Sequence, residues 1–112
     1  MLVLPWPPKE LSPNARVHRL AKARAAKAYR HACWALTKQS GVTLSGTPVH
    51  VQVTFVPPTK QARDLDNCLA AIKSGLDGIA DALKVNDKDF RPITIDIRHE
   101  VAGQVIVEFL EN

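Results

Sequence analysis

The chain has 112 residues, of which 46% are apolar and 23% are charged, and its 15 Lys and Arg outnumber its 11 Asp and Glu. This length and composition fit one packed domain over residues 1–112, and they argue against two domains or wholesale disorder. No apolar run approaches the roughly 20 residues that a membrane span needs. The N-terminal segment lacks the basic leader and small-residue cleavage site of a secretion signal. We therefore expect a single cytoplasmic domain outside the membrane.

The charges are separated along the chain. The stretch from Leu11 to Arg63 contains no acidic residue, and its cations are Arg16, Arg19, Lys22, Arg24, Lys27, Arg30, Lys38, Lys60 and Arg63. A cationic surface of this kind attracts a polyanion, because each neutralised phosphate releases condensed counterions. The distribution favours nucleic acid as a partner, and the alternative is an ordinary solvated helix face.

The first half of the chain predicts a strand, a proline-rich loop and a helix. The strand covers residues 2–4 and ends at Pro5-Trp6-Pro7-Pro8, because proline cannot donate to a strand ladder. The helix covers residues 15–39, and Gly41 follows its end. Its apolar stripe, at steps of three and four residues, consists of Val17, Leu20, Ala21, Ala25, Ala28, Ala32 and Leu36.

The second half predicts two further strands around a helix, and then a last strand. Residues 49–56 alternate strictly between apolar and polar side chains, which is typical of a half-buried strand. A helix over about 66–83 follows, and residues 92–100 and 104–110 predict the remaining strands. Gly75 and Gly78 each lower helix stability by up to about 1 kcal/mol, so a break of the helix at either glycine stays open.

This order of elements predicts an α/β fold of α+β character, with a single layer of two helices on a small mixed β-sheet. Strands 49–56 and 92–100 should be parallel in a right-handed βαβ unit. The last two strands should form a C-terminal hairpin, and the uncovered sheet face favours a homodimer. Cys33 and Cys68 fall within the helices, and without histidines at ligand spacing they predict small buried side chains in a reducing compartment.

Three aspartates are candidates for a divalent metal site. Asp64 and Asp66 lie between a strand and the second helix, and Asp87 lies in the loop after that helix. On an extended segment, an Asp-x-Asp pair directs both carboxylates to one face, where they can share a Mg²⁺ ion. Asp87 completes the site only if the chain folds back, because a helix of about 17 residues is roughly 25 Å long. The alternatives are helix capping by Asp64, Asp66 or Asn67 and a solvated turn at Asp87.

Lys73 is the candidate cation for the reaction. It lies two helical turns after Asp66 and so shares its helix face. A lysine there can contact the phosphate or stabilise the leaving oxygen. The alternative is a surface lysine next to Asp77, four residues further on.

Together these residues resemble the RusA family of Holliday junction resolvases, which is common in prophages. The resemblance covers nearly the whole chain: Leu4-Pro5-Trp6-Pro7-Pro8 ends the first strand, Asn14 precedes a basic helix, Arg63-Asp64-Leu65-Asp66-Asn67 opens the second helix, and Asn86-Asp87 follows it. It implies a magnesium-dependent endonuclease, with Mn²⁺ as a substitute, that acts as a homodimer on four-way DNA junctions in recombination and repair. It also implies catalytic metal ligands at Asp64, Asp66 and Asp87.

The chain departs from the family pattern at Ala70, where the family often has a catalytic lysine. Lys73 is the first candidate for that role, Lys60 and Arg63 are the others, and the remaining alternative is a reduced activity. We expect DNA contacts from Asn14, Arg16, His18, Lys60, Arg63 and Asn67, although Asn14 could instead cap the first helix. Two other functions stay open: a DNA-binding module without catalysis, and a metal-dependent nuclease for other branched or single-stranded DNA.

Overall fold

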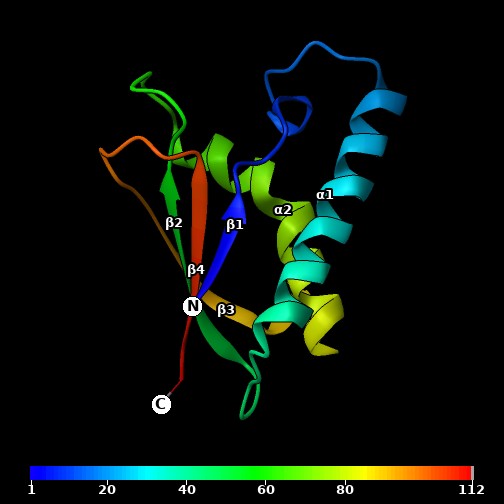
Figure 1. Cartoon of the computed structure of the whole chain (residues 1–112), viewed down its shortest axis with the longest axis vertical. Helices are drawn as coiled ribbons and strands as arrows, with labels where there is room; N and C mark the ends of the chain where they lie inside the picture. Colours follow the sequence, from blue (N-terminus) through cyan, green and yellow to red (C-terminus); the bar gives the residue numbers. More distant parts are fainter. Residues whose placement is uncertain (112) are drawn as a thin grey trace.

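The computed structural model describes residues 1–111 and contains a sheet and two long helices (Figure 1). In chain order the elements are β1 (Leu2–Pro5), α1 (Arg19–Ser40), β2 (Val49–Val56), α2 (Leu65–Leu83), β3 (Phe90–Ile97) and β4 (Gln104–Leu110), with short 3-10 helices at Lys9–Leu11 and Asp87–Asp89. Both helices lie on the same side of the sheet (Figure 1). Within the described chain, no helix combines the length and the apolar character that a membrane crossing requires.

The four strands form one mixed sheet in the order β1-β4-β2-β3. β2 and β3 pair in parallel, as the sequence predicts, and α2 lies between them in the chain. The predicted C-terminal hairpin is wrong, because β4 pairs with β1 and β2 rather than with β3. The segment after β3 bonds to the end of β2, where Arg98 donates to the Phe55 carbonyl and Ala102 donates to the Pro57 carbonyl. These bonds hold the segment between β3 and β4 against the end of β2.

The core lies between the sheet and the helices. β2 buries Val49, Val51, Val53 and Phe55, as the alternation of residues 49–56 predicts, but Thr54 and Val56 on its other face are buried as well. The fully buried members of the core include Leu4, Val51, Val53, Phe55, Val105 and Val107 from the sheet, Ile72 and Ile79 from α2, and Cys33 from α1. Both cysteines are free and buried, as predicted, and burial raises the pKa of Cys33 to about 11.

The buried face of α1 differs from the predicted stripe. α1 begins at Arg19 rather than at residue 15, and Leu20 is 56% exposed. The fully buried side chains are Tyr29, Cys33 and Thr37, and of the predicted stripe Ala25 and Leu36 pack against the core while partly buried. The helix therefore buries the face that carries the large Tyr29 ring, and the alanine-rich pattern did not predict that face.

α2 is continuous through both glycines. Gly75 lies against the Tyr29 ring, and a Cβ there would come within 2.7 Å of it. A Cβ on Gly78 would collide with the backbone carbonyl oxygen of Arg30. The glycines therefore do not break the helix. They allow α1 and α2 to approach closely, which also gives α2 its fixed position over the sheet.

Candidate functional site

Two segments far apart in the sequence meet in one cleft of about 430 Å³. One is the proline-rich loop after β1, and the other is the start of α2. The lining residues are Trp6, Pro7, Pro8, Lys9, Ser12, Asn14, Gln61, Ala62, Arg63, Asp64, Asn67, Cys68 and Ala71. The cleft thus joins two of the segments that carry the family resemblance, Leu4-Pro5-Trp6-Pro7-Pro8 and Arg63-Asp64-Leu65-Asp66-Asn67.

Hydrogen bonds and ring contacts hold Trp6 in the wall of this cleft. The Tyr29 hydroxyl donates to the Pro5 carbonyl at 2.6 Å, which ties the proline-rich loop to α1. The Trp6 amide donates to the Gly103 carbonyl, and its ring meets Phe55 edge-on with centroids 6.0 Å apart. The loop is therefore fastened to α1, to the sheet and to the segment before β4.

Arg63 is also held in place. Its guanidinium carbon lies 5.3 Å from the centroid of the Trp6 ring, a cation–π arrangement. Its terminal nitrogens donate to the Gln61 carbonyl and to the Thr59 hydroxyl, each at 3.2 Å. The cleft therefore has a preorganised positive charge next to Asp64.

Asp64 and Asp66 lie at the start of α2 with exposed side chains. Asp64 is the extended N-cap residue, and the Asn67 amide approaches its carboxylate at a long 3.5 Å. Asp66 is already within the first helical turn. The segment is therefore not extended at Asp66, and the alternation argument for a shared face is wrong there. Neither aspartate has an ion pair within residues 1–111, and the positive end of the helix dipole favours both charges.

Asp87 and Lys73 lie together, away from the cleft. The Lys73 ammonium is 2.7 Å from the Asp77 carboxylate and 2.5 Å from that of Asp87. The hydrogen bond from Lys73 lowers the pKa of Asp87 below its ordinary 3.8. Burial lowers the pKa of Lys73, but its hydrogen bonds to the two aspartates raise it by more. Lys73 is thus paired with Asp77, as its alternative interpretation predicts, and with Asp87 as well.

The single chain does not bring the three candidate metal ligands together. No group of three or more His, Cys, Asp or Glu side chains in residues 1–111 is placed to hold a metal ion. The chain does turn back after α2, far enough for Asp87 to reach Lys73. Lys73 is itself about 10 Å along the helix from Asp66, however. Asp64 and Asp66 therefore lie in one place and Asp87 in another.

The other predicted DNA contacts divide into two groups. Asn14, Arg63 and Asn67 line the cleft, whereas Arg16, His18 and Lys60 are exposed outside its lining. His18 is the N-cap of α1, where its Nδ1 accepts the Leu20 amide at 3.1 Å. Asn14 therefore does not cap this helix.

Sequence reasoning missed two cations beside Ala70. A hollow between α1 and α2 is lined by Arg19, Lys22, Ala70, Lys73 and Asp77 among others. The candidates for a substitute cation, Lys73, Lys60 and Arg63, lie on α2 and in the loop before it, but this hollow also receives cations from α1. The acid-free composition of α1 was the available signal. It could not reveal which residues of α1 face Ala70, because that depends on how the two helices pack.

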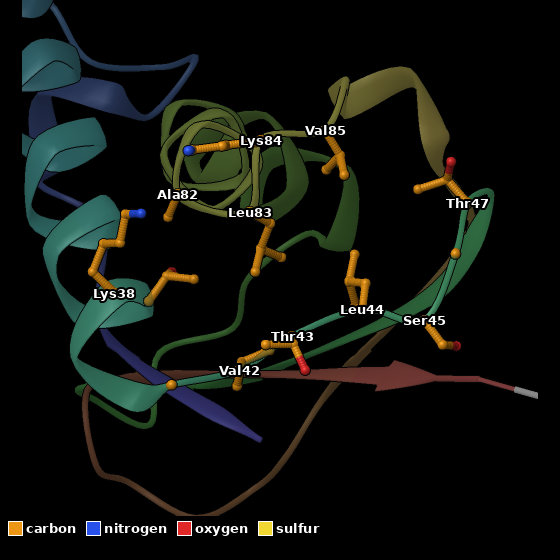
Figure 2. A pocket seen from close by; sticks show the side chains of 13 residues that line it. Lys38, Val42, Thr43, Leu44, Ser45, Thr47, Ala82, Leu83, Lys84 and Val85 are labelled. Carbon is orange, nitrogen blue, oxygen red and sulfur yellow. The ribbon is translucent and has the colours of Figure 1, made fainter.

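A cavity of about 550 Å³ lies at the opposite end of the molecule (Figure 2). It is formed by the ends of α1 and α2 and the loop that leads to β2. Val42, Leu44, Leu83 and Val85 contribute apolar side chains to its walls (Figure 2). None of the candidate residues from the sequence lines it, so the cleft at the start of α2 is the better functional candidate.

No family model matches the chain. The chain is similar to an uncharacterized protein of Xylella fastidiosa (strain Temecula1 / ATCC 700964), with 42% identity over 113 aligned positions. The match covers 95% of this chain and 72% of that protein, so the similarity extends over the domain rather than over one motif.

Proposed function

The chain belongs to the same family as this Xylella fastidiosa protein, and we propose that it is a magnesium-dependent endodeoxyribonuclease that resolves four-way DNA junctions as a homodimer. One observation carries the proposal: the proline-rich loop and the start of α2 converge in a single cleft. There a fixed guanidinium stands beside Asp64, which lines the cleft, while Asp66 follows outside the lining. Neither aspartate has a cationic partner in residues 1–111.

The donor atoms at the start of α2 suit a magnesium ion. Mg²⁺ prefers oxygen ligands, and one or two carboxylates usually hold it together with water and substrate phosphate oxygens. Asp64 and Asp66 would supply these carboxylates. When bound, the ion would activate a water molecule and stabilise charge on the phosphate. Asp87 stays a predicted third ligand, and that role requires release from Lys73 or a contribution from a second copy of the chain.

The residues around the aspartates would position the DNA. Arg63 is held against Trp6, so its charge is available to a phosphate without a large loss of side-chain freedom. The amides of Asn14 and Asn67 line the same cleft and can hydrogen-bond to phosphate or sugar oxygens. Arg19 and Lys22 bring positive charge to the hollow beside Ala70, where either could assist the leaving oxygen. Lys73 lines the same hollow and could take that role only after release from Asp77 and Asp87.

A homodimer fits the symmetry of the proposed substrate. A four-way junction has two-fold symmetry, and two-fold-related subunits would place matched nicks at a fixed spacing. The sheet face opposite the helices exposes apolar side chains at Val3 and Leu110, and it is our candidate for the contact between subunits.

The decisive test is cleavage of a synthetic mobile junction with and without Mg²⁺ by the native chain and by Asp64→Asn and Asp66→Asn. We expect both variants to lose cleavage while they keep or tighten junction binding, because a negative charge next to the DNA is removed. Glu100→Gln is the matched control, since it removes the same charge from the exposed segment between β3 and β4. Cleavage that survives in both Asp variants contradicts the proposal.

A panel of substrates separates the other two functions. Metal-dependent cleavage of flaps or single strands in preference to junctions would indicate a different nuclease. Binding without cleavage of any substrate would indicate a DNA-binding module.

A further inference from the structure

The outer face of α1 carries a pair of stacked aromatic rings among cations. Lys27, His31, Trp34 and Lys38 recur at steps of three and four residues, so they form one stripe along the helix. All four are exposed. The rings of His31 and Trp34 stack with centroids 5.5 Å apart and an angle of 23° between their planes. The buried face of the helix is a different one, around Cys33.

This stripe borders a shallow hollow of about 330 Å³. The hollow is lined by Lys27, Arg30, His31, Trp34 and Asp81. Arg30 donates to Asp81 through two nitrogens, at 2.6 and 2.9 Å, so one wall is a fixed ion pair between α1 and α2. Lys27 has no ion pair within residues 1–111, and its charge remains available to a ligand.

The fold does not account for an indole in this position. Trp34 is 37% exposed and does not belong to the hydrophobic core. It also lies outside the lining of the cleft at the start of α2. An exposed aromatic platform beside cations has the chemistry that recognises a flat, apolar group joined to anions.

We propose that the outer face of α1 binds unpaired nucleotides of single-stranded DNA, with Trp34 and His31 stacking on a base. This inference rests on the proposed function only in taking DNA as the ligand. Every base has a π-face that can stack on an aromatic ring, and flanking cations follow the phosphates. Lys27 and Lys38 are about 16 Å apart along the helix, so they can contact non-adjacent phosphates on either side of a stacked base.

The preference for a single strand follows from accessibility. Bases in a duplex are stacked on one another, and their faces cannot reach Trp34. The lysines, in contrast, attract the phosphates of both forms. An acidic protein segment would satisfy the lysines but would leave the aromatic pair without a planar partner. Opened DNA arms at a branch point would offer unpaired bases to this surface.

The test measures binding without divalent metal, so that cleavage does not contribute. A labelled oligothymidylate and a labelled duplex of the same length are titrated with the native chain, Trp34→Ala and Trp34→Phe, and followed by anisotropy. We expect Trp34→Ala to weaken single-strand binding about tenfold or more and to change duplex binding little. Trp34→Phe should keep most of the affinity, because phenylalanine still stacks. Lys27→Ala should weaken both forms alike and reduce the salt dependence.

Intrinsic fluorescence gives a readout that needs no destabilising change. The chain has two tryptophans. Oligothymidylate should quench the indole emission of the native chain, and most of this quenching should be lost in Trp34→Phe, where only Trp6 of the cleft remains. An unchanged emission spectrum, or a Trp34→Ala protein with native circular dichroism and native single-strand affinity, overturns the inference.

The two proposals can fail separately. If Trp34 supports single-strand binding but no DNA is cut with Mg²⁺, the nuclease is wrong and the stacking platform stands. If junctions are cut while Trp34→Ala leaves single-strand binding unchanged, only the platform is wrong.

Discussion

The aspartates at the start of α2 and those further along the chain differ in their ion pairs. Asp64 and Asp66 have no cationic partner within residues 1–111, whereas Asp77, Asp81 and Asp87 each contact a cation. Lys73 pairs with Asp77 and Asp87, and Arg30 of α1 pairs with Asp81. The acids look alike in the sequence, but Asp64 and Asp66 are not held by a cation and so remain free to bind a ligand.

The paired acids also change the surface that the sequence suggests. The acid-free stretch predicts an uninterrupted positive face on α1, but Asp81 reaches across from α2 and neutralises Arg30. Both partners are about half exposed, so this pair contributes no more than about 1 kcal/mol. Its larger consequence is to remove Arg30 from the free cations of α1, which leaves Arg19, Lys22, Arg24, Lys27 and Lys38 without an ion pair in residues 1–111.

Metal binding gives the largest expected difference between the two groups of acids. Asp64→Asn and Asp66→Asn should each weaken Mn²⁺ binding, followed by electron paramagnetic resonance, by about tenfold or more. Asp81→Asn should leave it unchanged, because that carboxylate is held by Arg30. Asp87→Asn decides between a metal site of Asp64 and Asp66 alone and a site that also includes Asp87. A loss of binding as large as that of Asp64→Asn would contradict the single-chain geometry and support a three-aspartate site.

Close approach of the helices brings Arg30 to Asp81, and Gly78→Ala should disturb it. A methyl group at this position meets the Arg30 carbonyl, so we expect a loss of about 1–3 kcal/mol in unfolding free energy. This loss should appear although alanine favours the helix by about 1 kcal/mol. Urea unfolding measures it. Gly46→Ala is the control, because a Cβ there meets no atom within 4 Å, and equal stability of the two variants would rule out the close packing.

The cleft itself should depend on Tyr29. Tyr29→Phe removes the hydrogen bond to the Pro5 carbonyl and leaves that acceptor without its partner, which costs about 1–2 kcal/mol. Because Pro5 precedes Trp6, the Trp6 ring and the Arg63 side chain that lies over it should become less fixed in the cleft. Affinity for the junction should therefore fall more than affinity for oligothymidylate. Parallel titrations of the two DNAs test this. An equal decrease for both would mean that Tyr29 acts on overall stability alone.

Periodicity predicted the elements better than their arrangement. The bounds of β2 and β4 and the parallel pairing of β2 with β3 follow from alternation and chain order. The insertion of β4 between β1 and β2 does not, because several strand orders bury the same apolar faces equally well. The sequence also could not show why a glycine stands at position 78 within a continuous helix, since the reason is its contact with α1.

The candidate site was predictable in its parts and not in its assembly. The motifs around Trp6 and Asp64 are legible in the sequence, and each lines the cleft. Their meeting depends on a hydrogen bond from Tyr29, a residue in neither motif. The joint site of Asp87 with Asp64 and Asp66 was implied by the family resemblance. Side-chain pairing with Lys73 decides where Asp87 lies, and no spacing rule contains that information.

The smallest expected effect is the pH dependence of the paired acids. The hydrogen bond from Arg30 lowers the pKa of Asp81 below its ordinary 3.8. A carboxyl group with a lowered pKa stabilises the folded state above its unfolded pKa, and this contribution disappears as the pH falls through the folded value. Asp81→Asn should therefore be less stable than the native chain at neutral pH, by less than about 1 kcal/mol because the pair is half exposed.

Well below pH 3.8 the two proteins should become equally stable, since the native carboxyl is then protonated as well. Urea unfolding of both proteins across this range measures the difference, and high salt at neutral pH should reduce it. A difference that persists unchanged at low pH would show that Asp81 acts by packing rather than by charge. In that case the contrast between aspartates with and without an ion pair would not hold at Asp81.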